Sequence, residues 1–334
     1  MVNNRITIGG QNYKFADTFD SVITVPDCFV MPANKIGTGN GEAKLYMSSK
    51  ESMRGFFGAE GFVADCFLVK QDLLDYLQTL RNEYIKPSYN YRGKDKFPTL
   101  WAERVKLVDS LPDIISFKVA DQAQIGGPRG YVNSDDDGYK LIRQLSLPLV
   151  TYISVMQVFG TDGKVRYYWK LFVDFEALGD RTPLVFKYGK RDLREPLPVA
   201  ASAHETEATR ETRARVGQQK YREKLLEECP YCPITMVNDD RLLIASHIKP
   251  WAVSDDKERV DPKNGFMLSP LYDKLFDQGF ITFGNDKKMQ VSHWLSPRNC
   301  ERLNLKDGFY VQRLPLDEKR LVYLEYHQKF VFKG

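Results

Sequence analysis

The stretch from Cys232 to Phe283 constrains the fold most, because its signals come in a definite order. The apolar run RLLIASHI predicts a strand with His247 at its end, and a Pro-Trp turn, a polar loop and the pair Asn264-Gly265 follow. None of the other three histidines, His204, His293 and His327, stands at a strand end before a polar loop. His247 is therefore the strongest candidate for a functional histidine.

The helix that follows has well-marked ends. Ser269 can cap it, Pro270 suits the first helical position and Gly279 can close the last turn. These signals predict a short helix over residues 270–278. Asp273 and Asp277 stand four residues apart, so they share one face of that helix.

Several separated motifs identify a family: RVGQQKYREKLL, CPIT, ASHIKPW, KNGFMLSPLYDKLFDQGFITF and LEYHQKFVF. In this order they resemble the HNH, or ββα-metal, module found at the carboxy end of predicted restriction endonucleases. The resemblance runs from about Arg215 to the end of the chain. Because several motifs match in order, it is far more specific than one short pattern. It implies a metal-dependent module that cuts DNA.

The resemblance also implies a role for three residues: His247 as general base, Asn264 as the residue that holds the site together, and Asp273 as metal ligand. An imidazole accepts a proton from water near neutral pH, and a carboxylate is a hard ligand suited to Mg²⁺ or Mn²⁺. The metal would stabilise the phosphorane and the departing 3′ oxygen while water attacks in line. The products would be a 5′-phosphate and a 3′-hydroxyl.

The chain departs from the commonest HNH pattern at two positions. Ser246 stands where many members carry a metal-binding Asp or His, and Asp273 replaces the helix histidine. A single carboxylate with waters and phosphate oxygens can still hold Mg²⁺, which retains much of its hydration shell. Asp277 is the candidate for a second metal contact, direct or through water.

The length of 334 residues favours two domains, and a change in composition marks the boundary. DLREPLPVAASAHETEATRE has prolines, small residues and alternating charges without an apolar stripe, so residues 196–206 are expected to form a linker. The predicted domains are 1–195, for DNA recognition, and 207–334, the HNH endonuclease domain. The predicted fold class is α+β: a mixed α/β domain followed by a ββα-metal domain.

Local patterns predict the elements of the first domain. RITIGGQNYKF favours a hairpin around Gly9 and Gly10, and LPLVTYISVMQVF and VRYYWKLFVDF flank GTDGK, whose Asp-Gly pair suits a tight hairpin turn. DSVITVPDCFVM and EAKLYM suggest two further strands. QDLLDYLQTLRNEYI and LWAERVKLVDSL have the apolar spacing of helices.

Three groups of side chains are candidates for DNA contacts, and each is also compatible with an ordinary solvated surface. One loop combines tyrosines that stack on bases with cations that neutralise phosphates: Tyr89, Tyr91, Arg92 and Lys94. A glycine-rich loop carries Gln124 and Arg129, whose groups can read base edges. The HNH region contributes three cations: Arg215, Arg222 and Lys249.

Two rival sites are weaker. Cys229 and Cys232 form a CxxC pair, but only Cys300 follows, so half of a zinc ligand set is missing and structural Zn²⁺ is not expected. Asp27, Glu42 and Lys44 match the PD…ExK pattern of another nuclease class. That pattern carries little information in an acid-rich chain of this length.

The function predicted is that of a restriction-type endonuclease that acts on double-stranded DNA, and the net charge of +4 is compatible with this partner. The target is either an unmodified site, as for an orthodox type II enzyme, or a modified base. The aromatic-rich first domain favours the modified base, because a flipped base is commonly held between aromatic side chains. A non-cleaving DNA-binding regulator with a decayed HNH module is the alternative that Ser246 suggests.

Assembly and compartment follow from similar arguments. One HNH site handles one strand, so a double-strand break predicts a homodimer. The start, MVNNRITIGG, has no basic segment before an apolar run, and no stretch is long enough to span a bilayer. With five scattered cysteines, these features predict a cytoplasmic protein of a prokaryotic cell with no membrane partner.

Overall fold

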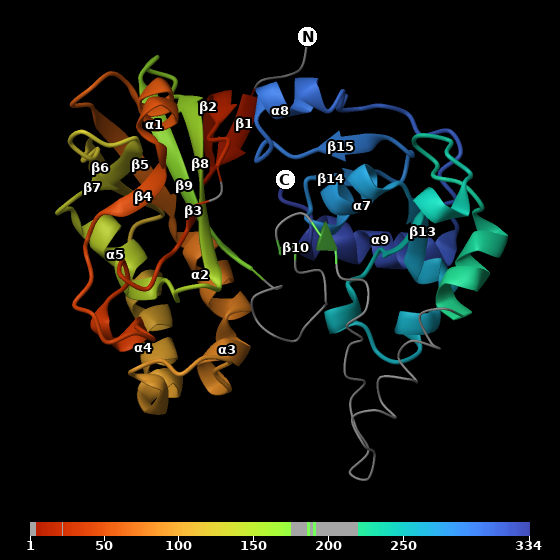
Figure 1. Ribbon diagram of the computed structural model, residues 1–334, viewed down its shortest axis with the longest axis horizontal. Coiled ribbons are helices and arrows are strands. Elements are labelled where there is room, and N and C mark those ends of the chain that lie inside the picture. The colour runs from red at the N-terminus through yellow and green to blue at the C-terminus, as the bar shows by residue number, and fades with distance from the viewer. Residues whose placement is uncertain (1–4, 22, 175–185, 188–189, 192–219) are drawn as a thin grey trace. The chain divides into compact units, whose positions relative to one another are not determined.

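The structure is a computed structural model that describes residues 5–21, 23–174, 186–187, 190–191 and 220–334. The chain divides into an amino-terminal unit, Met1–Gly179, and a carboxy-terminal unit, Asp180–Gly334 (Figure 1). This division comes earlier than the predicted boundary at residue 195, and the predicted linker, 196–206, lies outside the described residues. No described helix is both long and apolar enough to cross a membrane.

The described strands of the amino-terminal unit form one nine-stranded sheet. Neighbouring strands are antiparallel except β5 and β9, which run parallel, and β3 (Ile23–Thr24) pairs with β8. The order across the sheet is β1 (Arg5–Ile8), β2 (Gln11–Thr18), β8 (Thr151–Phe159), β9 (Val165–Val173), β5 (Val63–Val69), β6 (Ile114–Asp121), β7 (Arg129–Asn133) and β4 (Leu45–Ser49).

Two hairpins in this sheet confirm sequence predictions. Gly9 and Gly10, with φ of 55° and 76°, form the two-residue turn between β1 and β2, which only residues tolerant of positive φ can adopt easily. In the turn between β8 and β9, the Gly160 amide donates to the Lys164 carbonyl and Gly163 has a φ of 74°. The glycines of the two turns thus set the register of both hairpins.

Helices cover one face of the sheet. Alternation along β5 places Ala64, Cys66 and Leu68 in the core with the apolar residues of the helices, and turns Asp65 and Phe67 to the opposite face. Helix α1 contacts β4 and β7, α2 contacts β5 and β9, and α5 contacts β6. The helices are α1 (Lys50–Phe57), α2 (Lys70–Thr79), α3 (Arg81–Ile85), α4 (Phe97–Asp109) and α5 (Asp137–Leu145).

Two expectations for this unit were wrong in extent. The strand expected over 20–31 is reduced to β3, because the Asp27 carboxylate accepts the amides of Ile36 and Gly37 and holds the chain in a loop there. The single helix expected over 71–85 is two helices, α2 and α3, which meet at the buried residue Leu80.

The carboxy-terminal unit is built from short elements around its own core. Strands β12 (Ile244–His247) and β13 (Gly265–Leu268) pair antiparallel, and α7 (Pro270–Asp277) contacts both of them. The other elements are a helix over 220–228, β14 (Ile281–Phe283), β15 (Met289–Val291), α8 (Pro297–Arg302) and α9 (Glu318–Phe330). A further pair, β10 (Phe186–Lys187) with β11 (Lys190–Arg191), precedes them in the chain.

Helix α7 confirms the predicted helix and its ends. Ser269 is its N-cap residue, although the Ser269 side chain makes no capping bond to a helix amide, and Pro270 is the first helical residue. Gly279 has a φ of 68°, and a Cβ there would lie 2.0 Å from the Val331 carbonyl oxygen. Only glycine therefore fits the position that follows the C-cap residue, Gln278.

Candidate active site

The candidate functional histidine lies at the loop end of a two-stranded hairpin. His247 is the last residue of β12 and pairs with Gly265, the first residue of β13. The loop between them contains three short 3₁₀ segments: Trp251–Val253, Glu258–Val260 and Pro262–Asn264. The long polar loop of the sequence thus surrounds the end of the strand that carries His247.

Three groups orient the imidazole of His247. Its ring stacks on Tyr221, with centroids 4.2 Å apart and planes 12° apart, and Trp251 meets it edge-on at 5.4 Å. His247 Nε2 lies 3.0 Å from the backbone carbonyl oxygen of Arg259. Because a carbonyl oxygen only accepts, Nε2 carries the hydrogen in the neutral ring and the lone pair is on Nδ1.

The surroundings keep His247 neutral. Loss of hydration, opposed by the hydrogen bond to the Arg259 carbonyl and helped by the Arg259 charge, lowers its pKa to about 4. At neutral pH the ring is therefore uncharged and able to accept a proton at Nδ1.

Asn264 ties the loop together from inside. Its side-chain oxygen accepts the Lys249 amide at 2.8 Å, and its Nδ2 donates to the carbonyls of Lys249 and Glu258 and to Ser254 Oγ. The side chain is fully buried. One amide group thus joins the beginning, middle and end of the loop, and an apolar replacement would leave several buried polar groups without partners.

Two of the predicted DNA-binding cations of this unit are engaged within the protein. Lys249 Nζ contacts both carboxylate oxygens of Glu258, at 2.7 and 2.6 Å, and both side chains are mostly covered. The Arg222 guanidinium donates to the backbone carbonyls of Leu243 and Asp240. These bonds make both cations part of the scaffold around β12. Arg215 lies outside the described residues.

Helix α9 supports the same end of the hairpin through a buried arginine. The Arg320 guanidinium donates to the carbonyls of Gly265 and Pro262 and forms ion pairs with Glu228 and Asp317. Sequence reasoning missed Arg320, Tyr221 and Arg259 as parts of this site. The only signal was Tyr221 in the apolar stripe of its helix, because the other two contacts depend on residues distant in the chain.

The two carboxylates predicted to bind metal both lie on α7. Asp273 is in the first turn and only 6% exposed, whereas Asp277 is the last helical residue and partly exposed. Ser246 is buried in β12 opposite Phe266. No three His, Cys, Asp or Glu residues gather as a metal site in the part of the chain that the structure describes. The donors available fit a hard, largely hydrated cation that completes its coordination with water and phosphate oxygens.

The CxxC pair belongs to the core of this unit. Cys229 and Cys232 are both fully buried, and the Cys229 thiol lies 3.2 Å from the Tyr231 carbonyl oxygen. Cys232 Sγ lies 3.8 Å from Ser269 Oγ. Burial raises the pKa of the Cys229 thiol, whereas the pKa of Cys232 is lowered because hydrogen bonds from Thr235, Ser269 and Ile234 outweigh the effect of burial.

In the amino-terminal unit, the structure corrects one predicted DNA contact. Tyr91 is buried, and its hydroxyl donates to Glu83 at 2.9 Å, so its ring is not available to stack on a base. Tyr89 packs edge-on against Tyr91, and the Arg92 guanidinium donates to the carbonyls of Gly37 and Gly39. Lys94 is exposed.

Gln124 lies in the loop between β6 and β7, Arg129 is the first residue of β7, and both are exposed. The residues of the rival PD…ExK pattern have local partners instead. Asp27 accepts loop amides, and Glu42 forms an exposed ion pair with Lys44 at 2.9 Å. These contacts account for all three residues of the rival pattern without a metal.

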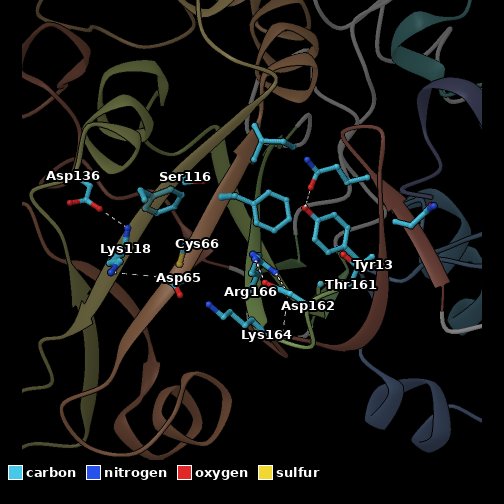
Figure 2. A pocket seen from close by; sticks show the side chains of 16 residues that line it. Tyr13, Asp65, Cys66, Ser116, Lys118, Asp136, Thr161, Asp162, Lys164 and Arg166 are labelled. Carbon is cyan, nitrogen blue, oxygen red and sulfur yellow. Dashed lines mark hydrogen bonds and ion pairs between the residues drawn. The ribbon is translucent and has the colours of Figure 1, made fainter.

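A cavity of about 830 Å³ lies in the amino-terminal unit on the sheet face turned away from the core (Figure 2). Tyr13 and the β8–β9 turn stand on one side of it, Lys118 and Asp136 on the other, and Asp65 between them. None of the residues predicted from sequence lines it. The available signal was the alternation of Ser116 and Lys118 along β6, with Asp65 on β5, which marks an exposed strand face.

Comparison with protein families identifies the segment that contains His247. The sequence model of the HNH endonuclease family matches residues 232–284, which contain β12, the loop, β13 and α7. No curated protein matches the chain. Residues 232–284 are thus an HNH endonuclease domain, which implies a nuclease with a nucleic-acid substrate and, as is general for such enzymes, a divalent metal.

Proposed function

We propose that this protein is a DNA endonuclease in which the HNH domain hydrolyses the phosphodiester bond and the amino-terminal unit recognises the DNA. The observation that carries the proposal is the orientation of His247, whose Nε2 is bound to the Arg259 carbonyl so that Nδ1 is the basic atom. A neutral, oriented imidazole at the loop end of the β12–β13 hairpin is suited to activate water.

In this proposal His247 Nδ1 takes a proton from a water molecule, whose oxygen forms a new bond to phosphorus. The bond from phosphorus to the 3′ oxygen breaks, that oxygen takes a proton from water, and the products are a 5′-phosphate and a 3′-hydroxyl. His247 then releases its proton to solvent. Asn264 keeps the loop, and with it the Arg259 carbonyl, in place. Asp273, with support from Asp277, would hold Mg²⁺ or Mn²⁺, which would supply positive charge to stabilise the crowded phosphorus and the departing oxygen.

The decisive experiment uses supercoiled plasmid with Mg²⁺ or Mn²⁺. The His247→Ala variant is expected to lose cutting, whereas His293→Ala, at a histidine outside the hairpin, keeps it. Full cutting by His247→Ala would refute the assignment. Loss of cutting only after Glu42→Gln would move the active site to the amino-terminal unit.

The biological setting that fits best is a restriction system with a preference for modified DNA. Two HNH sites cut two strands, so the active form is a homodimer, bound to a target of matching symmetry. Digestion of plain, methylated and hydroxymethylated DNA separates a modification-dependent enzyme from an orthodox type II enzyme. Sedimentation with and without DNA tests the dimer.

A DNA-binding regulator with a decayed HNH module is the second candidate. Ser246, buried in β12 where many family members carry a ligand, favours it. DNA binding without cutting on every substrate of the same panel, in both metals, would support the regulator and exclude the nuclease.

A further inference from the structure

The loop between β6 and β7 contains a tight turn, and Ile125 is at the tip of that turn. The Gly127 amide lies 3.4 Å from the Gln124 carbonyl, and Gly126 has a φ of 70°. These are the features of a four-residue type II turn over residues 124–127, in which the third residue must tolerate positive φ. Ile125 is the second residue of the turn.

The strands beneath this turn are braced. The Gln124 amide donates to the Arg129 carbonyl at 3.0 Å, so the hairpin stays paired up to the turn. At its base, the Asp121 carboxylate accepts the amides of Ala123 and Gly61 and pairs with the Arg54 guanidinium at 2.8 Å.

Helix α1 supports the returning strand. The Lys50 amide donates to the Pro128 carbonyl at 2.7 Å. Gly130 lies so close to Met53 that a Cβ there would approach the Met53 side chain to 3.0 Å. These contacts with α1 therefore hold the β6–β7 hairpin, and with it the turn, in a fixed position.

Ile125 is 99% exposed, more than any other large apolar residue described, and the next in the same unit is Val63 at 64%. Isoleucine is among the residue types most often buried. Its neighbours in the turn, Gln124, Gly126 and Gly127, provide no apolar side chain. A lone aliphatic group of this kind is too small for a protein interface, which requires a broad patch, but it suffices to enter a base stack.

We propose that Ile125 is a wedge that inserts between adjacent base pairs of duplex DNA, while Gln124 and Arg129 contact base edges and backbone beside it. The inference rests on the proposed function, because it assumes DNA as the substrate. The β-branched side chain is stiff, so insertion costs it little rotamer freedom. Gln and Arg side chains provide donors for base edges and phosphates. Insertion unstacks one step and kinks the duplex.

The test measures unstacking directly on the full chain, with EDTA present so that the DNA stays intact. Duplexes carry 2-aminopurine, whose fluorescence rises when it unstacks, and are either fully paired or contain one mismatch. The wild-type chain is expected to raise the fluorescence and to bind the mismatched duplex several-fold more tightly, because unstacking costs least there. Ile125→Ala is expected to abolish both effects, and Ile125→Leu to keep them. Val63→Ala controls for loss of an exposed aliphatic side chain.

The outcomes separate this proposal from the nuclease assignment. His247-dependent cutting with unchanged fluorescence and mismatch preference in Ile125→Ala overturns the wedge and leaves the nuclease intact. The wedge is also overturned if Ile125→Ala changes only self-association, because the tip then contacts a second copy of the chain. A wild-type chain that neither binds nor cuts DNA refutes both proposals.

Discussion

The imidazole of His247 lies face to face with the phenol ring of Tyr221, at 4.2 Å between centroids. The Tyr221 hydroxyl donates to the carbonyl of Asn264, the residue before the strand partner of His247. Tyr221 lies outside the residues that match the HNH family. A side chain from the preceding helix therefore orients the candidate base and closes the hairpin behind it.

This packing explains a glycine and leads to the first prediction. A Cβ at Gly265 would lie 2.0 Å from the Tyr221 hydroxyl oxygen, although the backbone there is extended and suits any residue. Gly265→Ala is expected to cost about 1–3 kcal/mol of unfolding free energy through overpacking, and to reduce cutting by displacing Tyr221 from His247.

The Tyr221→Phe variant should relieve the closest part of that clash, because the nearest remaining atoms, Leu225 Cδ2 and Tyr221 Cζ, would lie 2.9 and 3.0 Å away. Alone it loses one hydrogen bond, worth about 1 kcal/mol. Combined with Gly265→Ala it should restore part of both stability and cutting. Urea unfolding and plasmid cutting of the four proteins measure this coupling, and additive losses would show that the two residues do not interact.

The second prediction concerns the pH dependence of cutting. His247 is active as a base only when neutral, and its pKa is lowered to about 4. The kcat/KM for cutting should therefore lack the fall near pH 6.5 that an ordinary histidine base produces on acidification. Rates between pH 5 and 8 at fixed metal concentration test this. A histidine-dependent inflection near pH 6.5 would contradict the lowered pKa of His247.

The third prediction concerns stability and His327, which is 1% exposed. Its ring contacts Thr282 Oγ1 and the Phe276 carbonyl, and burial lowers its pKa to about 4. Below pH 6.5 the unfolded chain binds a proton here that the native protein does not bind until about pH 4. Acidification through this window therefore destabilises the native state, by about 3 kcal/mol for this group.

His327→Gln should remove this contribution, so its stability should fall less than that of the wild type between pH 7 and pH 4.5. Chemical denaturation at the two pH values gives the loss of stability of each protein. The contributions of the carboxylates, which the two proteins share, cancel when the losses of variant and wild type are subtracted. His293→Gln serves as a comparison variant. Burial also lowers the pKa of His293, so this replacement should reduce the pH dependence of stability in the same direction. Equal pH dependence of His327→Gln and the wild type would contradict a neutral His327.

The fourth prediction tests Asn264. Replacement by Ala removes the partner of the Lys249 amide and of the Glu258 carbonyl, and one of the two donors to the Lys249 carbonyl. It is expected to cost about 2–4 kcal/mol and to abolish cutting. Asn285→Ala, at an exposed turn residue, is the matched control. A loss below about 1 kcal/mol would mean that other contacts hold the loop.

The fifth prediction concerns the metal. With at most two carboxylates offered by α7, the protein should bind Mg²⁺ or Mn²⁺ weakly alone and more tightly when DNA phosphates complete the coordination. Asp273→Asn should raise the metal concentration needed for half-maximal cutting more than Asp277→Asn does. Calorimetry with and without uncut DNA provides a second readout. Tight binding to the free protein, unaffected by Asp273→Asn, would place the metal elsewhere.

Features set by neighbouring residues were predictable from sequence. The turns at Gly9-Gly10 and Gly163, and the helix from Pro270 to Asp277, follow from glycine conformations, a proline and a capping position. The order of motifs around His247 predicted the HNH domain in the same way, because the hairpin and helix of that domain are consecutive in the chain.

Only the tertiary structure decided which side chains are available and how the base is oriented. Tyr91 and Lys94 are equally good candidates for DNA contact from the sequence, because both belong to one polar, aromatic loop. In the structure Tyr91 is buried against Glu83, whereas Lys94 is exposed. The stacking of Tyr221 and the Arg259 carbonyl bond that sets the tautomer of His247 join residues 26 and 12 positions away. Such contacts depend on how distant segments pack, which local pattern and composition do not encode.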